Sequence, residues 1–99
     1  MIKKLKKNKT NKKVDFVKLQ KSISFLSYNS FLKSKYWKEV KKKILKRDDY
    51  KCILCGSTKN LNIHHTTYKN FKNEHRHLND LSTLCNNCHY KVHLVMEIV

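Results

Sequence analysis

The chain has few of the residues that usually interrupt regular structure. Its 99 residues include no proline and one glycine, so turns and helix ends must be located from other signals. No apolar run approaches the length of about 18 residues that a membrane-spanning helix needs, and the lysine-rich start lacks the apolar segment of a secretory signal peptide. These absences argue against a membrane or secreted protein. They predict a location in the cytoplasm, or in the host cytoplasm if a phage encodes the protein.

Acidic residues are also scarce. Seven Asp and Glu oppose 23 Lys and Arg, which gives a formal net charge of +16. An excess of this size predicts a polyanionic partner, of which nucleic acid is the simplest. A basic peptide bound to a membrane surface is the competing interpretation, but four cysteines and six histidines do not fit it. We therefore expect DNA and no membrane as the partner, although charge alone does not exclude RNA.

The first third of the chain is predicted to be a basic extension. Residues 1–13 hold seven lysines and no acid, and a block of like charges repels itself. Residues 14–30 could form a short helix or a strand, and serines between the apolar residues weaken both interpretations. We therefore expect residues 1–30 to be partly disordered or loosely packed, and residues 31–99 to form the folded domain.

The folded domain begins with an amphipathic, lysine-rich helix. Ser34 is a suitable N-cap, and Trp37, Val40 and Ile44 recur at helical spacing. A domain of this size has a marginal hydrophobic core and usually needs a metal or disulfide to stabilise it. The elements that we expect are a helix over 35–47, short strands over 61–64 and 81–84, a loop over 66–79 and a last helix over 87–97.

Two Cys-x-x-Cys pairs, separated by 29 residues, carry the strongest chemical signal. Each pair offers two thiolates to one ion, and two pairs complete a tetrahedral zinc site. Two disulfides are the alternative, but nothing in the sequence indicates secretion. Because four protein ligands leave no open position, this zinc would be structural. The predicted ligands are Cys52, Cys55, Cys85 and Cys88.

Four of the histidines lie beside these elements. His64 and His65 end the first predicted strand, His89 follows the last cysteine directly, and His93 shares a helical face with His89. A strand packed against this helix would bring the imidazoles to one point, which is enough for one divalent cation and a free base. The alternative is that these are ordinary surface histidines.

The stretch from Trp37 to His93 resembles the HNH endonucleases that carry a four-cysteine zinc site. The matching segments read WKEVKKKILKRDDYKCILCG, LNIHHTTY and NDLSTLCNNCHYKVH, within about 57 of the 99 residues. The resemblance implies an α+β fold, namely a small zinc-stabilised ββα-metal (His-Me finger) domain with a preceding basic helix. In that fold a two-stranded hairpin and a helix grip one divalent ion.

The resemblance also assigns roles by position. His64 and His89 would be ligands of the divalent ion, and His65 would be the general base that deprotonates the attacking water. His93 would be a further ligand or would touch the scissile phosphate. The central asparagine of the motif falls on Asp80, which we expect to brace the loop, with the neighbouring Asn79 as a second candidate for that role.

These assignments predict a metal-dependent DNA endonuclease that hydrolyses phosphodiester bonds. Neutral imidazole accepts a proton from water near neutral pH, and Mg2+ or Mn2+ stabilises charge on the phosphate; imidazole ligands also accept zinc or nickel. One such site cuts one strand, so a monomer would nick and a homodimer would cut both strands. The alternative is a non-catalytic zinc-binding DNA-binding module, such as a phage regulator or recombination accessory protein.

Basic side chains of the lysine-rich helix and of the N-terminus are the candidate phosphate contacts. Such contacts give an affinity that falls with salt, and they read no bases directly. A solvated helix face is the alternative. Arg76, in the predicted loop, is a weaker candidate. The predicted nucleic-acid-binding residues are Lys38, Lys41, Lys42, Lys46, Arg47 and Arg76.

Overall fold

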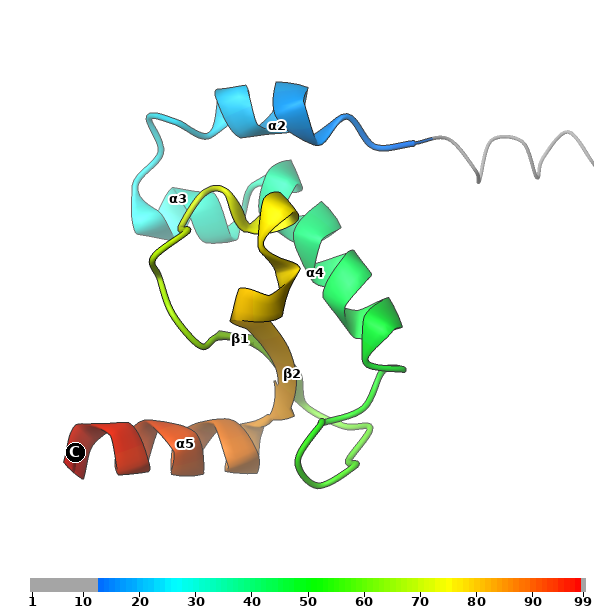
Figure 1. Cartoon of the computed structure of the whole chain (residues 1–99), viewed down its shortest axis with the longest axis vertical. Coiled ribbons are helices and arrows are strands. Elements are labelled where there is room, and N and C mark those ends of the chain that lie inside the picture. The colour runs from blue at the N-terminus through cyan, green and yellow to red at the C-terminus, as the bar shows by residue number, and fades with distance from the viewer. Residues whose placement is uncertain (1–12, 99) are drawn as a thin grey trace, which may run out of the picture.

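The computed structural model describes residues 13–98, which form a small compact α+β domain (Figure 1). The prediction for residues 1–12 and their lysines lies outside these residues. Within the described range, four α-helices and two short 3₁₀ helices surround a two-stranded sheet. The elements are α2 (Phe16–Ser22), α3 (Tyr28–Leu32), α4 (Lys35–Arg47), β1 (Leu61–His65), η1 (Glu74–Arg76), η2 (Leu78–Asp80), β2 (Leu81–Cys85) and α5 (Asn86–Ile98).

Helix α4 is the central element of the core, and its predicted bounds are confirmed. The Ser34 side chain accepts a hydrogen bond from the Trp37 N–H at 3.1 Å, as an N-cap does. Trp37, Val40 and Ile44 are buried on the face that turns toward the rest of the molecule. The apolar residues that repeat at helical spacing in the sequence are therefore the ones that contact the core.

Strands β1 and β2 are antiparallel and lie between α4 and α5 (Figure 1). His65 pairs with Leu81, and His64 pairs with Ser82. Because successive side chains of a strand point to opposite faces, His65 and Leu81 face α4, whereas His64 faces α5. The two adjacent histidines thus belong to different sides of one thin sheet.

The packed domain begins earlier than we expected. We placed its start at residue 31, but Ile23 is 1% exposed and belongs to the same core cluster as residues of α4. Phe16 and Leu19 precede Ile23 at helical spacing on α2, and they pack against that cluster. The Gln20 side chain also donates to the Lys72 carbonyl at 2.9 Å. Residues 16–30 are therefore part of the packed unit.

The scarcity of glycine is visible in the backbone. Gly56 has a positive φ of 81°, and four residues with side chains adopt the same left-handed region, which is costly for most of them. These residues are Asp49, Tyr50, Asn60 and Lys72. The chain therefore makes its tight turns largely without glycine.

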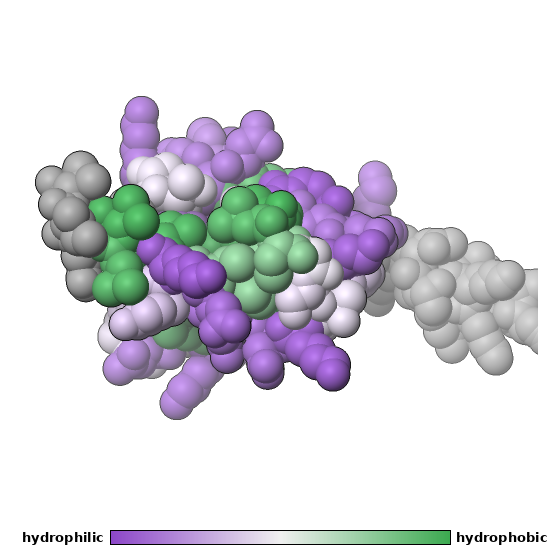
Figure 2. Space-filling view, turned by 90° about the horizontal axis from the view of Figure 1, so that it is seen from below, coloured by the Kyte–Doolittle hydropathy of each residue, from purple (hydrophilic) through white to green (hydrophobic). Residues whose placement is uncertain are grey.

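On the face seen in Figure 2, hydrophilic residues surround an apolar region on the side of α5. A shallow apolar hollow there is lined by Leu54, Cys88, Lys91, Val92 and Val95. Among residues 13–98, no helix combines the length and the apolar character that crossing a bilayer requires.

Candidate metal centres and active site

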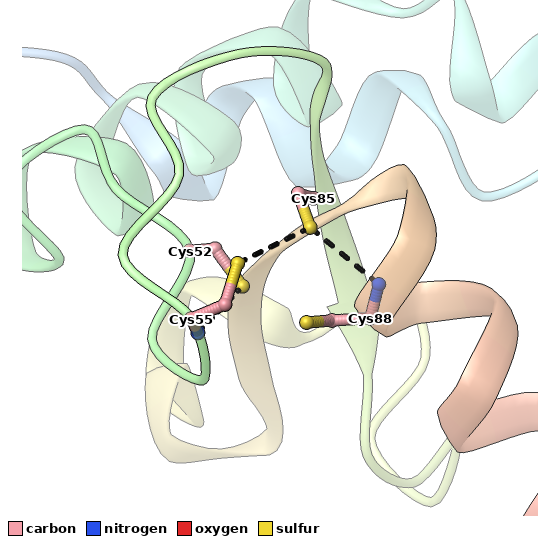
Figure 3. Close-up of side chains that lie close together, drawn as sticks. All are labelled: Cys52, Cys55, Cys85 and Cys88. Atoms are coloured by element: carbon pink, nitrogen blue, oxygen red, sulfur yellow. Dashed lines mark hydrogen bonds between the residues drawn. The ribbon is translucent and has the colours of Figure 1, made fainter.

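The four cysteines converge from two distant parts of the chain (Figure 3). Cys52 and Cys55 lie in the turn after α4, whereas Cys85 ends β2 and Cys88 lies in the first turn of α5. Their sulfur atoms all lie within 4.8 Å of one another. The described residues thus contain the four-cysteine cluster that the spacing predicted, and it fits a structural zinc ion.

Backbone amides support each half of the cluster. The Cys55 N–H donates to Sγ of Cys52, and the Cys88 N–H donates to Sγ of Cys85, both at 3.5 Å. Burial raises the pKa of the Cys52 thiol, but backbone N–H groups of Cys85, Cys55 and Leu54 outweigh it and lower the pKa to about 6. Burial and the neighbouring thiols raise the pKa of Cys88 to about 12. Four sulfurs this close lose all their protons only when a cation balances their charge.

A second cluster consists of three imidazoles. His64 comes from β1, and His89 and His93 come from one face of α5; one ring nitrogen of each lies within 4.8 Å of the others. The His89 and His93 Nε2 atoms are 3.0 Å apart. Burial, followed by the neighbouring His89 and His93, lowers the pKa of His64, and burial and His93 lower that of His89. His64 and His89 therefore present neutral nitrogen lone pairs, which are what a divalent metal binds.

His65 lies beside this cluster and has different partners. Its Nε2 atom is 2.9 Å from Oε2 of Glu74, and both side chains are buried. Trp37 and Tyr68 stack against its ring, with centroids at 5.0 and 4.5 Å. Burial raises the pKa of Glu74, but the hydrogen bond from His65 and backbone N–H groups outweigh it, so the net shift is downward. The carboxylate is therefore ionised at neutral pH.

One cavity joins these groups. It has a volume of about 500 Å³, and its lining includes His64, His65, His89, His93 and Lys41. The three-imidazole cluster, the separate buried imidazole and a lysine from α4 thus face a common space. The sequence grouped the same histidines from their spacing.

Glu74 belongs to the site although it is not among the predicted site residues. It lies in the predicted loop, yet it is 1% exposed in η1. The available signal was that Glu74 is the single acid between Asp49 and Asp80 in a strongly basic chain.

Asp80 forms hydrogen bonds with both ends of the segment that follows β1. Its carbonyl accepts hydrogen bonds from the N–H and the hydroxyl of Thr66, at 2.7 and 2.9 Å. Its Oδ2 atom accepts a hydrogen bond from Asn70 at 2.7 Å. These bonds tie the end of β1 to the start of β2. Asn79, the other candidate, is exposed.

The predicted phosphate contacts have different surroundings. Lys38, Lys42 and Lys46 are exposed on the outer side of α4, and Arg76 is exposed on η1. Arg47 is instead engaged within the molecule, because its guanidinium donates to Asp48 and to two backbone carbonyls. We therefore assign Arg47 a structural role and leave it out of the candidate nucleic-acid surface.

Comparison with known proteins finds no family model, no curated protein and no solved structure that matches this chain. The candidate site is accordingly defined by its own geometry and by the chemistry of its side chains.

Proposed function

We propose that the protein is a metal-dependent endonuclease of the HNH type that hydrolyses phosphodiester bonds in DNA. The convergence of His64, His89 and His93, with His65 in the same cavity, carries the proposal. A strand pair followed by a helix supplies these residues, as a ββα-metal unit would. The net charge of +16 favours a polyanionic substrate.

Each group has a chemical task in this proposal. The three clustered imidazoles would hold a divalent cation such as Mg2+ or Mn2+, which when bound supplies positive charge at the phosphate. His65 takes a proton from a water molecule, whose oxygen attacks phosphorus while the bond to the 3′ oxygen breaks, and the leaving 3′ oxygen takes a proton from solvent. The products carry 5′-phosphate and 3′-hydroxyl ends. Lys41, on the cavity wall, would contact a phosphate of the substrate.

A plasmid assay tests the catalytic part. We expect the zinc-loaded protein to nick supercoiled DNA with Mg2+ or Mn2+, and His65→Ala to lower the rate roughly 10²- to 10⁴-fold, the usual contribution of a general base. His77→Ala is the matched control, because His77 is exposed and does not line the cavity. Equal rates for wild type and His65→Ala would remove His65 from the mechanism.

Metal titration separates the nuclease from a non-catalytic zinc-binding DNA-binding module. That alternative needs the cysteines and lysines but not the imidazole cluster, so it predicts one tightly bound metal ion per chain. The proposed nuclease predicts a second, weaker ion that His89→Ala removes while the tightly held zinc stays. A single site in the wild-type protein would favour the DNA-binding module.

A further inference from the structure

A buried carboxylate lies next to the proposed general base. Glu74 is 1% exposed, and its Oε2 atom is 2.9 Å from Nε2 of His65. A carboxylate so far from water is stable only when charged groups or N–H donors surround it. His65 supplies such a donor when its proton lies on Nε2.

The other oxygen of Glu74 is held separately. Tyr36, a buried residue of α4, donates its hydroxyl to Oε1 at 3.2 Å. The same hydroxyl accepts the His75 N–H at 3.1 Å. Because both carboxylate oxygens are bound, Glu74 presents Oε2 to the imidazole in one orientation. Stacking of Trp37 and Tyr68 on His65 restricts the plane of the imidazole ring.

We propose that Glu74 is the positioning residue of this site: it accepts the Nε2–H of His65 and so keeps the lone pair on Nδ1. This inference rests on the proposed function, in which His65 is the base. A neutral imidazole carries one proton, so a carboxylate that holds this proton at Nε2 makes Nδ1 the basic nitrogen. When Nδ1 takes the proton of water, the ring becomes a cation, and the adjacent carboxylate stabilises its charge.

The arrangement also explains how one short strand serves two purposes. His64 turns toward α5 and joins the metal-binding cluster, while His65 turns toward α4 and reaches Glu74. The alternation of side chains along β1 places the two neighbouring histidines on opposite faces, and Glu74 holds the His65 ring on the α4 side. Without Glu74, nothing in the described contacts would select Nδ1 over Nε2 as the basic nitrogen.

Nitrogen-15 NMR and kinetics on the zinc-loaded full chain test this role. We expect the wild-type His65 ring to show a protonated Nε2 and an unprotonated Nδ1. Glu74→Gln should populate the other tautomer and lower kcat for plasmid nicking with Mn2+ roughly 10²- to 10⁴-fold. KM and Mn2+ affinity should stay unchanged, because Glu74 touches neither the clustered imidazoles nor Lys41. Tyr36→Phe removes the donor to Oε1 and the hydroxyl's contacts with His75 but leaves the pair of Oε2 and Nε2, and it should cause a smaller fall in kcat.

Glu39→Gln is the matched control. It removes the same charge from a carboxylate on α4 that is paired with Lys42 rather than with His65, and it should leave kcat and the His65 tautomer unchanged. A wild-type His65 protonated on Nδ1, or a folded Glu74→Gln that nicks at the wild-type rate, would overturn the positioning role. If Glu74→Gln fails to fold, the tautomer of His65 in the wild-type protein and the kcat of Tyr36→Phe still test the positioning role. A wild-type protein that cuts no DNA would refute the proposed function, whereas the tautomer measurement would still report on Glu74.

Discussion

At the scale of single residues, Arg47 and Asp48 connect the end of α4 to the start of β2. The Arg47 guanidinium donates to both carboxylate oxygens of Asp48, at 2.8 and 2.9 Å, and to the carbonyls of Leu78 and Leu81, at 2.9 and 2.7 Å. Asp48 also accepts the Thr83 N–H at 3.0 Å. The hydrogen bond from Arg47 lowers the pKa of Asp48 despite partial burial, so the pair is ionised at neutral pH.

Replacing Arg47 with methionine should therefore destabilise the fold. The change removes the guanidinium donors to Asp48 and to two carbonyls, so we expect Arg47→Met to lower the free energy of unfolding at pH 7 by about 1–2 kcal/mol. That range is the lower part of the span for charge-assisted hydrogen bonds, because Arg47 is partly exposed and solvent screens it. Urea denaturation of the zinc-loaded protein measures this change in the free energy of unfolding.

Lys42→Met provides the comparison on the same helix. Lys42 pairs with Glu39 at 3.2 Å, but its side chain is 71% exposed, and an exposed pair of this kind contributes little stability. We expect its unfolding curve to overlay that of the wild type. Equal effects of the two substitutions would mean that Arg47 does not hold β2 to α4.

At the scale of elements, helix α4 presents lysines to two different surroundings. Lys41 lines the cavity that holds the histidines. Lys43, two residues later, turns to the other side, where its Nζ atom lies 5.8 Å from the centre of the Phe16 ring. Substitution of Lys41 or of Lys43 removes the same charge from the same helix, but only the change at Lys41 should affect DNA binding at the site.

We expect Lys41→Ala to weaken DNA binding and to reduce the slope of log K against log salt by about one, the effect of losing one phosphate contact. Lys43→Ala should leave that slope at its wild-type value. Fluorescence anisotropy of a labelled duplex over a range of salt concentrations gives both slopes. Indistinguishable slopes for the two variants would mean that the bound DNA does not reach the cavity.

Sequence patterns located the elements whose apolar residues repeat regularly or whose ends carry a local signal. The helix that starts after Ser34 and the two strands are examples, because their signals lie within a few residues of one another. The packing of Ile23 and the burial of Glu74 depend instead on contacts with distant residues, such as Tyr36 and His65. Such contacts join residues far apart in the sequence, so the sequence pattern left the structure of residues 14–30 open and did not place Glu74 beside His65.

At the scale of the whole molecule, the cysteine cluster joins two parts of the chain that lie far apart in the sequence. The turn after α4 supplies one pair, and the junction of β2 with α5 supplies the other. Cys88 lies directly before His89, so a zinc ion held by the four cysteines would also fix where α5 begins. The imidazole cluster, and with it the proposed catalytic cation site, would therefore depend on the structural zinc although the two sites share no ligand.

We therefore expect that removing the structural zinc also removes the weaker metal site, whereas removing the weaker site leaves the structural zinc in place. Binding of structural zinc contributes on the order of 10 kcal/mol, which equals the whole stability of a typical small domain. Cys52→Ser or a strong chelator should therefore abolish the cooperative thermal transition and the weaker metal site together. His89→Ala should remove only the weaker site and keep the melting temperature. Circular dichroism follows the thermal transition, and metal titration counts the bound ions. A zinc-free protein that keeps its cooperative transition would show that the core alone holds α5 against the sheet.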